Sequence, residues 1–200
     1  MSESSHPHAG QEPPALARLE EITAASGFGM PSDRLTGTLL AALAASKPGG
    51  RLLELGTGTG LATSWLLHGM DATAHLTSID NDAAMQAIAH AALGADPRVH
   101  FVTADGADYL HTASATGERF DVIFADTWPG KYTALDTALA LLAPGALYVV
   151  DDMLPQPNWP PGHAAKVAAL RQTLAARTDL IVASLDWSTG IIVATKRHAG

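Results

Sequence analysis

The stretch RLLELGTGTGLAT, residues 51–63, decides the fold that the sequence predicts. A short apolar run, RLLEL, is followed by glycines at every second position, Gly56, Gly58 and Gly60. A short apolar run that ends in glycines is typical of a buried strand. Glycine allows a sharp turn and a close approach of the backbone to a ligand. The residues that follow, LATSWLLHGM, have a helical pattern. The stretch therefore predicts strand, ligand-binding turn and helix.

Strands and helices alternate along the rest of the chain. The expected strands are RLLEL (51–55), HLTSID (75–80), VHFVTAD (99–105), FDVIFAD (120–126), GALYVVDD (145–152), LIVASL (180–185) and IIVATK (191–196). The expected helices are 14–26, 32–46, LATSWLLHGM, DAAMQAIAHAAL, ADYLHTAS, YTALDTALALLA and HAAKVAALRQTLAAR. This alternation predicts an α/β protein with a doubly wound, mostly parallel sheet. Only DWSTG (186–190) joins the last two strands, so we expect an antiparallel hairpin there.

Composition and charge narrow the class of protein. The chain has 200 residues, no cysteine and 47% apolar residues, which excludes disulfides and thiolate metal sites and fits a globular domain. No apolar run reaches the length of a membrane span, and the polar N-terminus does not resemble a signal peptide. We expect a cytoplasmic protein without a membrane partner. The net charge of −8, with scattered basic residues, disfavours nucleic acid as a partner.

The chain is expected to form one domain. Residues 1–13 are polar and proline-rich and are expected to be a disordered tail, and residues 14–200 a single domain. The helix predicted at 14–26 has two interpretations at this point. It packs either on its own core or on a second copy of the chain, in a homodimer.

Acidic residues close five consecutive strands. They are Glu54, Asp80, Asp105, Asp126 and the pair Asp151-Asp152. In open α/β sheets, ligands bind at the carboxyl ends of the strands. An aspartate after a strand is also a common helix cap. The repetition favours a cleft lined with hydrogen-bond acceptors.

The glycine turn does not match two common nucleotide motifs. A Walker loop needs Gly-Lys-Ser/Thr, but Leu61 follows Gly60, and the dinucleotide spacing fails at the same leucine. The spacing Glu54-x-Gly56-x-Gly58-x-Gly60, with Asp80 twenty residues later, resembles the class I S-adenosylmethionine (SAM)-dependent methyltransferases. The resemblance covers about residues 30–197 and implies a Rossmann-like seven-stranded sheet.

The resemblance assigns residues to the cofactor. The cofactor-binding set is Glu54, Gly56, Gly58, Gly60, Asp80, Asp105, Gly106, Ala107 and Asp126. An acid at Glu54 suits the ammonium of SAM, directly or through water. Asp80 is suited to the ribose hydroxyls. Asp105, followed by Gly106 and Ala107, resembles the adenine-binding position.

The second half of the chain resembles the catechol/caffeoyl-CoA-type O-methyltransferases. The resemblance rests on FDVIFADTWPGKY (120–132) and LLAPGALYVVDDML (141–154). It implies that Asp126, Asp151 and Asp152 bind Mg²⁺ or another divalent cation, which would hold the hydroxyls of a small-molecule acceptor. In that family a lysine, thought to be the general base, follows the first aspartate by three residues. Pro129 stands there in this chain, and Lys131 comes two residues later.

Three candidates for the catalytic group therefore stay open: Lys131, Asp126 and His163. His163 follows a proline-rich insert, MLPQPNWPPGH, with Trp159, and Trp128 is also expected on a cleft loop. Small-molecule O-methyl transfer, assisted or not by a cation, is the function that the sequence favours. The alternatives are metal-independent methyl transfer to nitrogen or another atom, a nicotinamide-dependent oxidoreductase, and a non-catalytic cofactor-binding protein.

Overall fold

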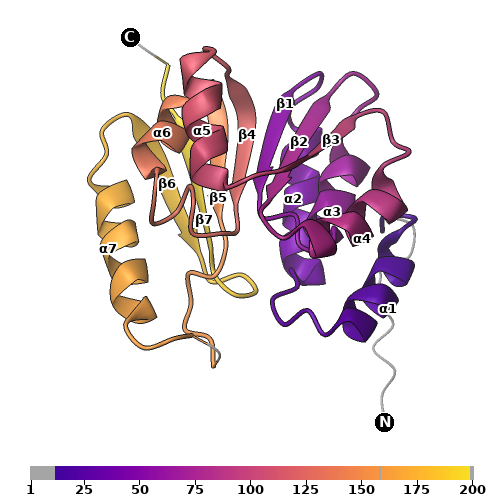
Figure 1. The fold of residues 1–200 in the computed structure, drawn as a ribbon. Coiled ribbons are helices and arrows are strands. Elements are labelled where there is room, and N and C mark those ends of the chain that lie inside the picture. The colour runs from indigo at the N-terminus through magenta and orange to yellow at the C-terminus, as the bar shows by residue number, and fades with distance from the viewer. Residues whose placement is uncertain (1–11, 158, 199–200) are drawn as a thin grey trace.

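The computed structural model describes residues 12–157 and 159–198. A seven-stranded sheet forms its centre, with helices on both faces (Figure 1). The strands are β1 (Arg51–Leu55), β2 (His75–Asp80), β3 (Val99–Thr103), β4 (Phe120–Ala125), β5 (Leu142–Val150), β6 (Leu180–Leu185) and β7 (Ile191–Lys196). The helices are α1 (Leu16–Ser26), α2 (Arg34–Ala45), α3 (Leu61–Gly69), α4 (Ala83–Leu93), α5 (Gly106–Ala115), α6 (Leu135–Ala140) and α7 (His163–Ala175).

The strand order is β3-β2-β1-β4-β5-β7-β6. The first five of these strands are parallel neighbours, whereas β7 pairs antiparallel with both β5 and β6. The predicted mostly parallel, Rossmann-like sheet with a C-terminal hairpin is confirmed. The chain leaves β1 toward β3 and returns to β4 on the other side of β1. This reversal creates a crevice at the carboxyl ends of β1 and β4, where such sheets bind ligands.

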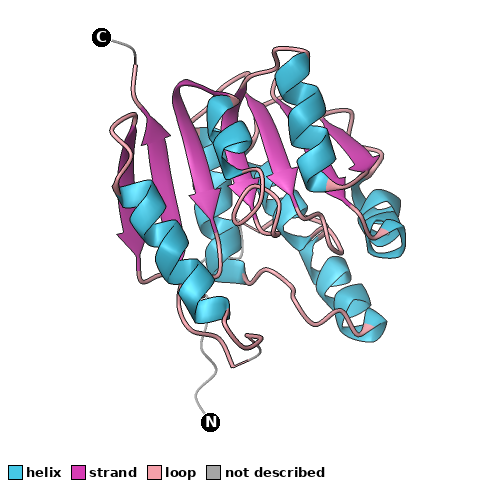
Figure 2. Cartoon of the chain, turned by 60° about the vertical axis from the view of Figure 1, so that its left-hand side comes forward, coloured by secondary structure: helices cyan, strands magenta, loops and turns pink. Residues whose placement is uncertain are grey.

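Helices cover both faces of the sheet (Figure 2), and the buried apolar residues between sheet and helices form two cores. Helices α1 to α4 pack into one core and α5 to α7 into the other. Leu16 and Leu19 of α1 are buried in the same core as α3, so this helix packs on its own chain. In β4, the segment from Val122 to Ala125 is buried completely. Strands covered on both faces are continuous in apolar residues, which is the sequence pattern that predicted them.

Several element boundaries differ from the prediction. The helix expected over 132–143 is limited to α6, because β5 begins at Leu142, which pairs with Phe120 of β4. The pairing then shifts between Phe120 and Val122, and a bulge accommodates the extra residues of β5. In addition, β3, β4 and β5 end before their acidic residues, which lie in the loops at the carboxyl edge.

The first described residues already contact the rest of the fold. Residues 1–11 of the expected tail lie outside the described residues. Glu12 forms an ion pair with Arg34 (2.6 Å), and Pro13 is buried. In the part of the chain that the structure describes, every helix is too short or too polar to cross a membrane.

Candidate functional site

The glycine turn after β1 depends on left-handed backbone conformations. Gly56, Gly58 and Gly60 have φ angles of 106°, 52° and 94°. A Cβ atom at Gly56 would lie 2.6 Å from Thr127 Cγ2, and one at Gly60 would lie 2.8 Å from Ala89 Cβ. The three glycines are thus required both by the backbone conformation and by close packing.

Asp80 ties the glycine turn to the end of β2. One carboxylate oxygen accepts a hydrogen bond from the amide of Gly58 (2.7 Å), and the other accepts from the amide of Asp82 (2.8 Å). The glycine turn and Asp80 line a cavity of about 270 Å³, which we call the glycine cavity. Its walls are Phe28, Met30, Pro31, Ser32, Gly56, Thr57, Gly58, Thr59, Leu61, Ala62, Asp80, Asn81, Asp82, Met85, Asp126, Thr127 and Asp152.

Glu54 lies beneath the turn and is fully buried. Its carboxyl accepts hydrogen bonds from the hydroxyls of Thr63 (2.6 Å) and Ser78, while Oε1 has no protein partner among the described residues. Burial raises the pKa of Glu54 to about 8. The side chain is not part of the cavity wall. Direct contact with a cofactor ammonium would therefore need a rearrangement, and a role for Glu54 toward the cofactor stays a prediction.

Asp105 caps helix α5. Its carboxylate accepts from the amides of Ala107 (2.8 Å) and Asp108 (3.1 Å). Gly106 faces Pro129, because a Cβ atom there would lie 2.8 Å from Pro129 Cβ. Asp105, Gly106 and Ala107 are absent from the walls of the glycine cavity. Their assignment to adenine remains a prediction.

A second cavity adjoins the glycine cavity at Asp126. It has a volume of about 420 Å³, and we call it the aspartate cavity. Its walls are Gly29, Met30, Pro31, Ser32, Asp33, Asp126, Thr127, Trp128, Lys131, Tyr132, Asp151, Asp152, Gln156, Trp159, Pro160, His163 and Thr189. The two cavities share Asp126, Thr127, Asp152 and the segment 30–32. The strand-end acids of β4 and β5 therefore lie where two binding spaces meet.

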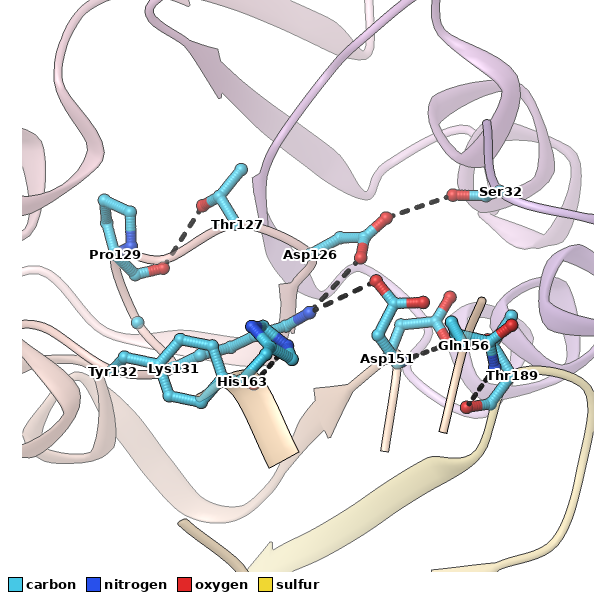
Figure 3. Close-up of polar contacts among 12 residues, drawn as sticks. Ser32, Asp126, Thr127, Pro129, Lys131, Tyr132, Asp151, Gln156, His163 and Thr189 are labelled. Carbon is cyan, nitrogen blue, oxygen red and sulfur yellow. Dashed lines mark hydrogen bonds and ion pairs between the residues drawn. The ribbon is translucent and has the colours of Figure 1, made fainter. Parts of the chain in front are cut away.

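Lys131 enters the aspartate cavity from the loop after β4 (Figure 3). Its side chain is 4% exposed, and Nζ lies 3.3 Å from Asp126 Oδ1 and 4.0 Å from Asp152 Oδ2. A tight turn sets this direction, since the amides of Lys131 and Tyr132 both donate to the carbonyl of Trp128. The lysine at the shifted position thus reaches the aspartates.

The carboxyl groups of Asp126 and Asp151, near Lys131, have raised pKa values and accept hydrogen bonds from protein donors. Burial raises the pKa of Asp126 to about 7, although the charge of Lys131 opposes the shift. Burial also raises the pKa of Asp151, whose Oδ1 accepts from the amide of Asp152 (2.7 Å) and from the hydroxyl of Thr189. Asp126 Oδ2 accepts from Ser32 (3.3 Å). Much of the acceptor capacity of Asp126 and Asp151 is used by protein donors.

The three aspartates do not have the arrangement expected of a divalent-cation site. Over residues 12–157 and 159–198, acidic and histidine side chains form no group of three placed to hold a metal ion. A magnesium site needs carboxylate oxygens free to face the ion, but Asp126 Oδ1 faces the ammonium of Lys131. The metal site predicted at Asp126, Asp151 and Asp152 is therefore not supported.

Aromatic side chains form the outer wall of the aspartate cavity. The ring of His163 packs against Trp159 (4.7 Å between centroids) and Tyr132 (5.4 Å), and Trp128 lies edge-on to Tyr132 (5.8 Å). Burial lowers the pKa of His163, which is thus a neutral imidazole near pH 7. Trp187 lies outside this wall, where its indole N–H donates to the carbonyl of Leu35 (2.8 Å).

Four further residues of the site were not predicted from the sequence. Thr127 and Tyr132 lie within the motif that follows β4, but no pattern in the sequence assigns them a role. Gln156 comes from the proline-rich insert, and Thr189 from the hairpin between β6 and β7. Thr189 reaches the site only because β7 pairs with β5, a contact between distant parts of the chain.

Comparison with known proteins identifies the family. Residues 53–153, about half of the chain, match the model of a methyltransferase domain. The chain belongs to this family. The resemblance to class I methyltransferases that the sequence showed is thereby confirmed, and the protein is a methyltransferase.

Individual relatives agree with this assignment. A protein of Mycolicibacterium vanbaalenii with the name "Putative O-methyltransferase" is 31% identical over 148 residues, 72% of this chain and 64% of that protein. A protein of the same name from Mycobacterium avium is 28% identical over 193 residues, 91% of this chain and 84% of that protein. The O-methyltransferase TomG of Streptomyces achromogenes, solved with SAM, has a TM-score of 0.80 at 24% identity, covering 94% of this chain and 91% of TomG.

Proposed function

We propose that this methyltransferase uses SAM to methylate a hydroxyl group of a small molecule. The observation that carries the proposal is the junction of two cavities at Asp126. One cavity has the glycine turn and Asp80, and the other has aromatic walls and polar groups. A methyl donor in the first and an acceptor in the second would meet at the shared wall. Positioning of two reactants in this way supplies much of an enzyme's acceleration.

Features of the glycine cavity support SAM as the methyl donor. Gly56 and Gly58 line it without side chains, so the backbone can approach a ligand closely. Asp80 offers carboxylate oxygens beside the turn. When bound, SAM supplies a methyl group whose bond to sulfur breaks as the acceptor oxygen bonds to its carbon. The complex of TomG with SAM supports this choice of cofactor.

The aspartate cavity fits a small acceptor. Trp128 and Trp159 offer apolar surface to a ring or chain, and Asp126 and Lys131 line the same cavity, where they would meet its hydroxyl. The hydroxyl must lose its proton as the oxygen gains the methyl group, and Lys131, Asp126 and His163 are the candidate proton acceptors in this cavity. The net charge of −8 favours a neutral or cationic acceptor over a polyanion. We expect the protein to act in the cytoplasm.

A product analysis tests the proposal. The full chain is incubated with isotopically labelled SAM and a panel of phenols, catechols, alcohols and amines, and the products are identified by mass spectrometry. We expect a labelled O-methyl product. A labelled N-methyl product with no O-methyl product would contradict transfer to oxygen. A chain that binds S-adenosylhomocysteine but transfers nothing would favour the non-catalytic alternative.

A further inference from the structure

We propose that the buried ammonium of Lys131 takes the place of a divalent cation among the three aspartates, so that transfer proceeds without a metal. This inference rests on the proposed function and concerns the same cavity. It also names the acceptor class, which is a molecule that presents a single hydroxyl and needs no adjacent second one.

The position of Lys131 carries the argument. Its ammonium lies 3.3 Å from a carboxylate oxygen of Asp126 and 4.0 Å from one of Asp152, and the side chain is 4% exposed (Figure 3). A lysine so deeply buried is stable in its charged form only when it is paired. A divalent ion between the same aspartates would stand close to this ammonium in a poorly screened space, where like charges repel strongly.

Contacts of Gly130 hold the turn that directs Lys131 toward the aspartates. Gly130 precedes the lysine with φ +86°, and a Cβ atom there would lie 2.5 Å from Leu55 Cδ1. The hydroxyl of Tyr148, a buried residue of β5, donates to the carbonyl of Gly130. Residues of β1 and β5, the strands on either side of β4, therefore hold the turn in place. Lys131 cannot leave the aspartates by a simple shift of its backbone.

Two further carboxylate oxygens of the cluster already accept hydrogen bonds from protein donors. Asp126 Oδ2 accepts from Ser32, and Asp151 Oδ1 accepts from Thr189 and from an amide. An octahedral cation would need several of these oxygens together with waters. An ammonium needs only three acceptors, one for each N–H. Asp126 Oδ1 accounts for one of them at 3.3 Å, and Asp152 adds an ion-pair contact at 4.0 Å. An oxygen of the acceptor substrate is suited to be a further acceptor.

This arrangement has a consequence for the chemistry. A divalent cation can hold two adjacent hydroxyls, whereas one N–H of Lys131 holds one oxygen. In the transfer, the acceptor oxygen bonds to the methyl carbon while the carbon–sulfur bond breaks and its electron pair stays on sulfur. The hydroxyl proton goes to one of the two other candidate acceptors that line this cavity, Asp126 or His163.

Cation binding to the complete chain tests the proposal without needing an acceptor. Mn²⁺ is titrated by calorimetry into EDTA-treated protein saturated with S-adenosylhomocysteine. The chains compared are wild type, Lys131→Met and Lys47→Met, a control whose lysine donates to the Gly145 carbonyl at the opposite end of the strands. We expect Mn²⁺ to bind Lys131→Met at least ~10-fold more tightly than the other two, because a like charge is removed. EDTA should leave the wild-type rate unchanged, and a phenol should be methylated about as well as a catechol.

Several outcomes would overturn the proposal. They are Mn²⁺ binding by wild type as tight as by Lys131→Met, no Mn²⁺ binding by a folded Lys131→Met, or a wild-type rate that EDTA abolishes and Mn²⁺ restores. If Lys131→Met does not fold, Lys131→Arg replaces it. This variant keeps the charge and should exclude Mn²⁺, and binding of the ion would overturn the proposal. A chain that fails to bind S-adenosylhomocysteine would instead refute the proposed function.

Discussion

Replacing Gly60 with alanine tests the packing that shapes the glycine turn. Gly60 has φ +94°, and an added methyl group would lie 2.8 Å from Ala89 Cβ and 3.1 Å from Ala89 Cα on helix α4. A left-handed backbone costs an L-residue about 1–2 kcal/mol. Forcing a methyl group against a helix backbone adds about 1–3 kcal/mol. We therefore expect the free energy of unfolding to fall by about 2–5 kcal/mol, measured by urea denaturation.

Gly117→Ala is the matched control for this measurement. Gly117 has a similar conformation, φ +75°, but an added Cβ atom meets nothing within 4 Å. This variant should lose only the conformational part, about 1–2 kcal/mol. The difference between the two variants isolates the contact with α4. If both lose the same free energy to within about 0.5 kcal/mol, the turn does not pack against Ala89 as described, and the reasoning is refuted.

Three further predictions concern the site. Glu54 holds its proton in the folded chain up to about pH 8 but loses it near pH 4.5 when unfolded, so wild-type stability should fall as pH rises through this interval. Glu54→Gln should reduce this dependence, measured as the change of the urea unfolding midpoint with pH. An unchanged pH dependence would show that the carboxyl is not buried as described. Asp80→Asn should weaken S-adenosylhomocysteine binding by about 10-fold or more, because one charged acceptor beside Gly58 is lost; calorimetry showing equal affinity would remove Asp80 from the cofactor site. Trp128→Ala should raise the KM for the acceptor without changing the KM for SAM, because Trp128 lines only the aspartate cavity. Its stability should fall by about 1–2 kcal/mol, since half of Trp128 is buried and its ring contacts Tyr132 and Lys166. A change in the KM for SAM alone would contradict this placement.

Local patterns were sufficient to predict most of the fold. The bounds of β1, β2, β6 and β7 follow from apolar runs that end in glycine, aspartate or a short polar loop. The helix expected over 132–143 was too long, because the sequence there has a helical pattern but Leu142 pairs with Phe120. Such a contact between distant residues overrides local preference, and periodicity alone does not reveal it.

The site was predictable in part. Asp126, Asp151 and Asp152 follow parallel strands, and strand ends meet at one edge of the sheet, so their proximity could be expected from the order of elements. The direction of Lys131 could not, because it depends on a turn held by Tyr148 from another strand. Ser32 also comes to Asp126 from a distant loop. Hydrogen bonds of this kind depend on tertiary packing, which one sequence does not show.

The most direct test of this account is calorimetric titration of S-adenosylhomocysteine into the wild-type chain, with NADH as the comparison ligand. We expect one binding site for S-adenosylhomocysteine per chain, weakened by Asp80→Asn, and no binding of NADH. Binding of NADH with none of S-adenosylhomocysteine would contradict the account and favour an oxidoreductase.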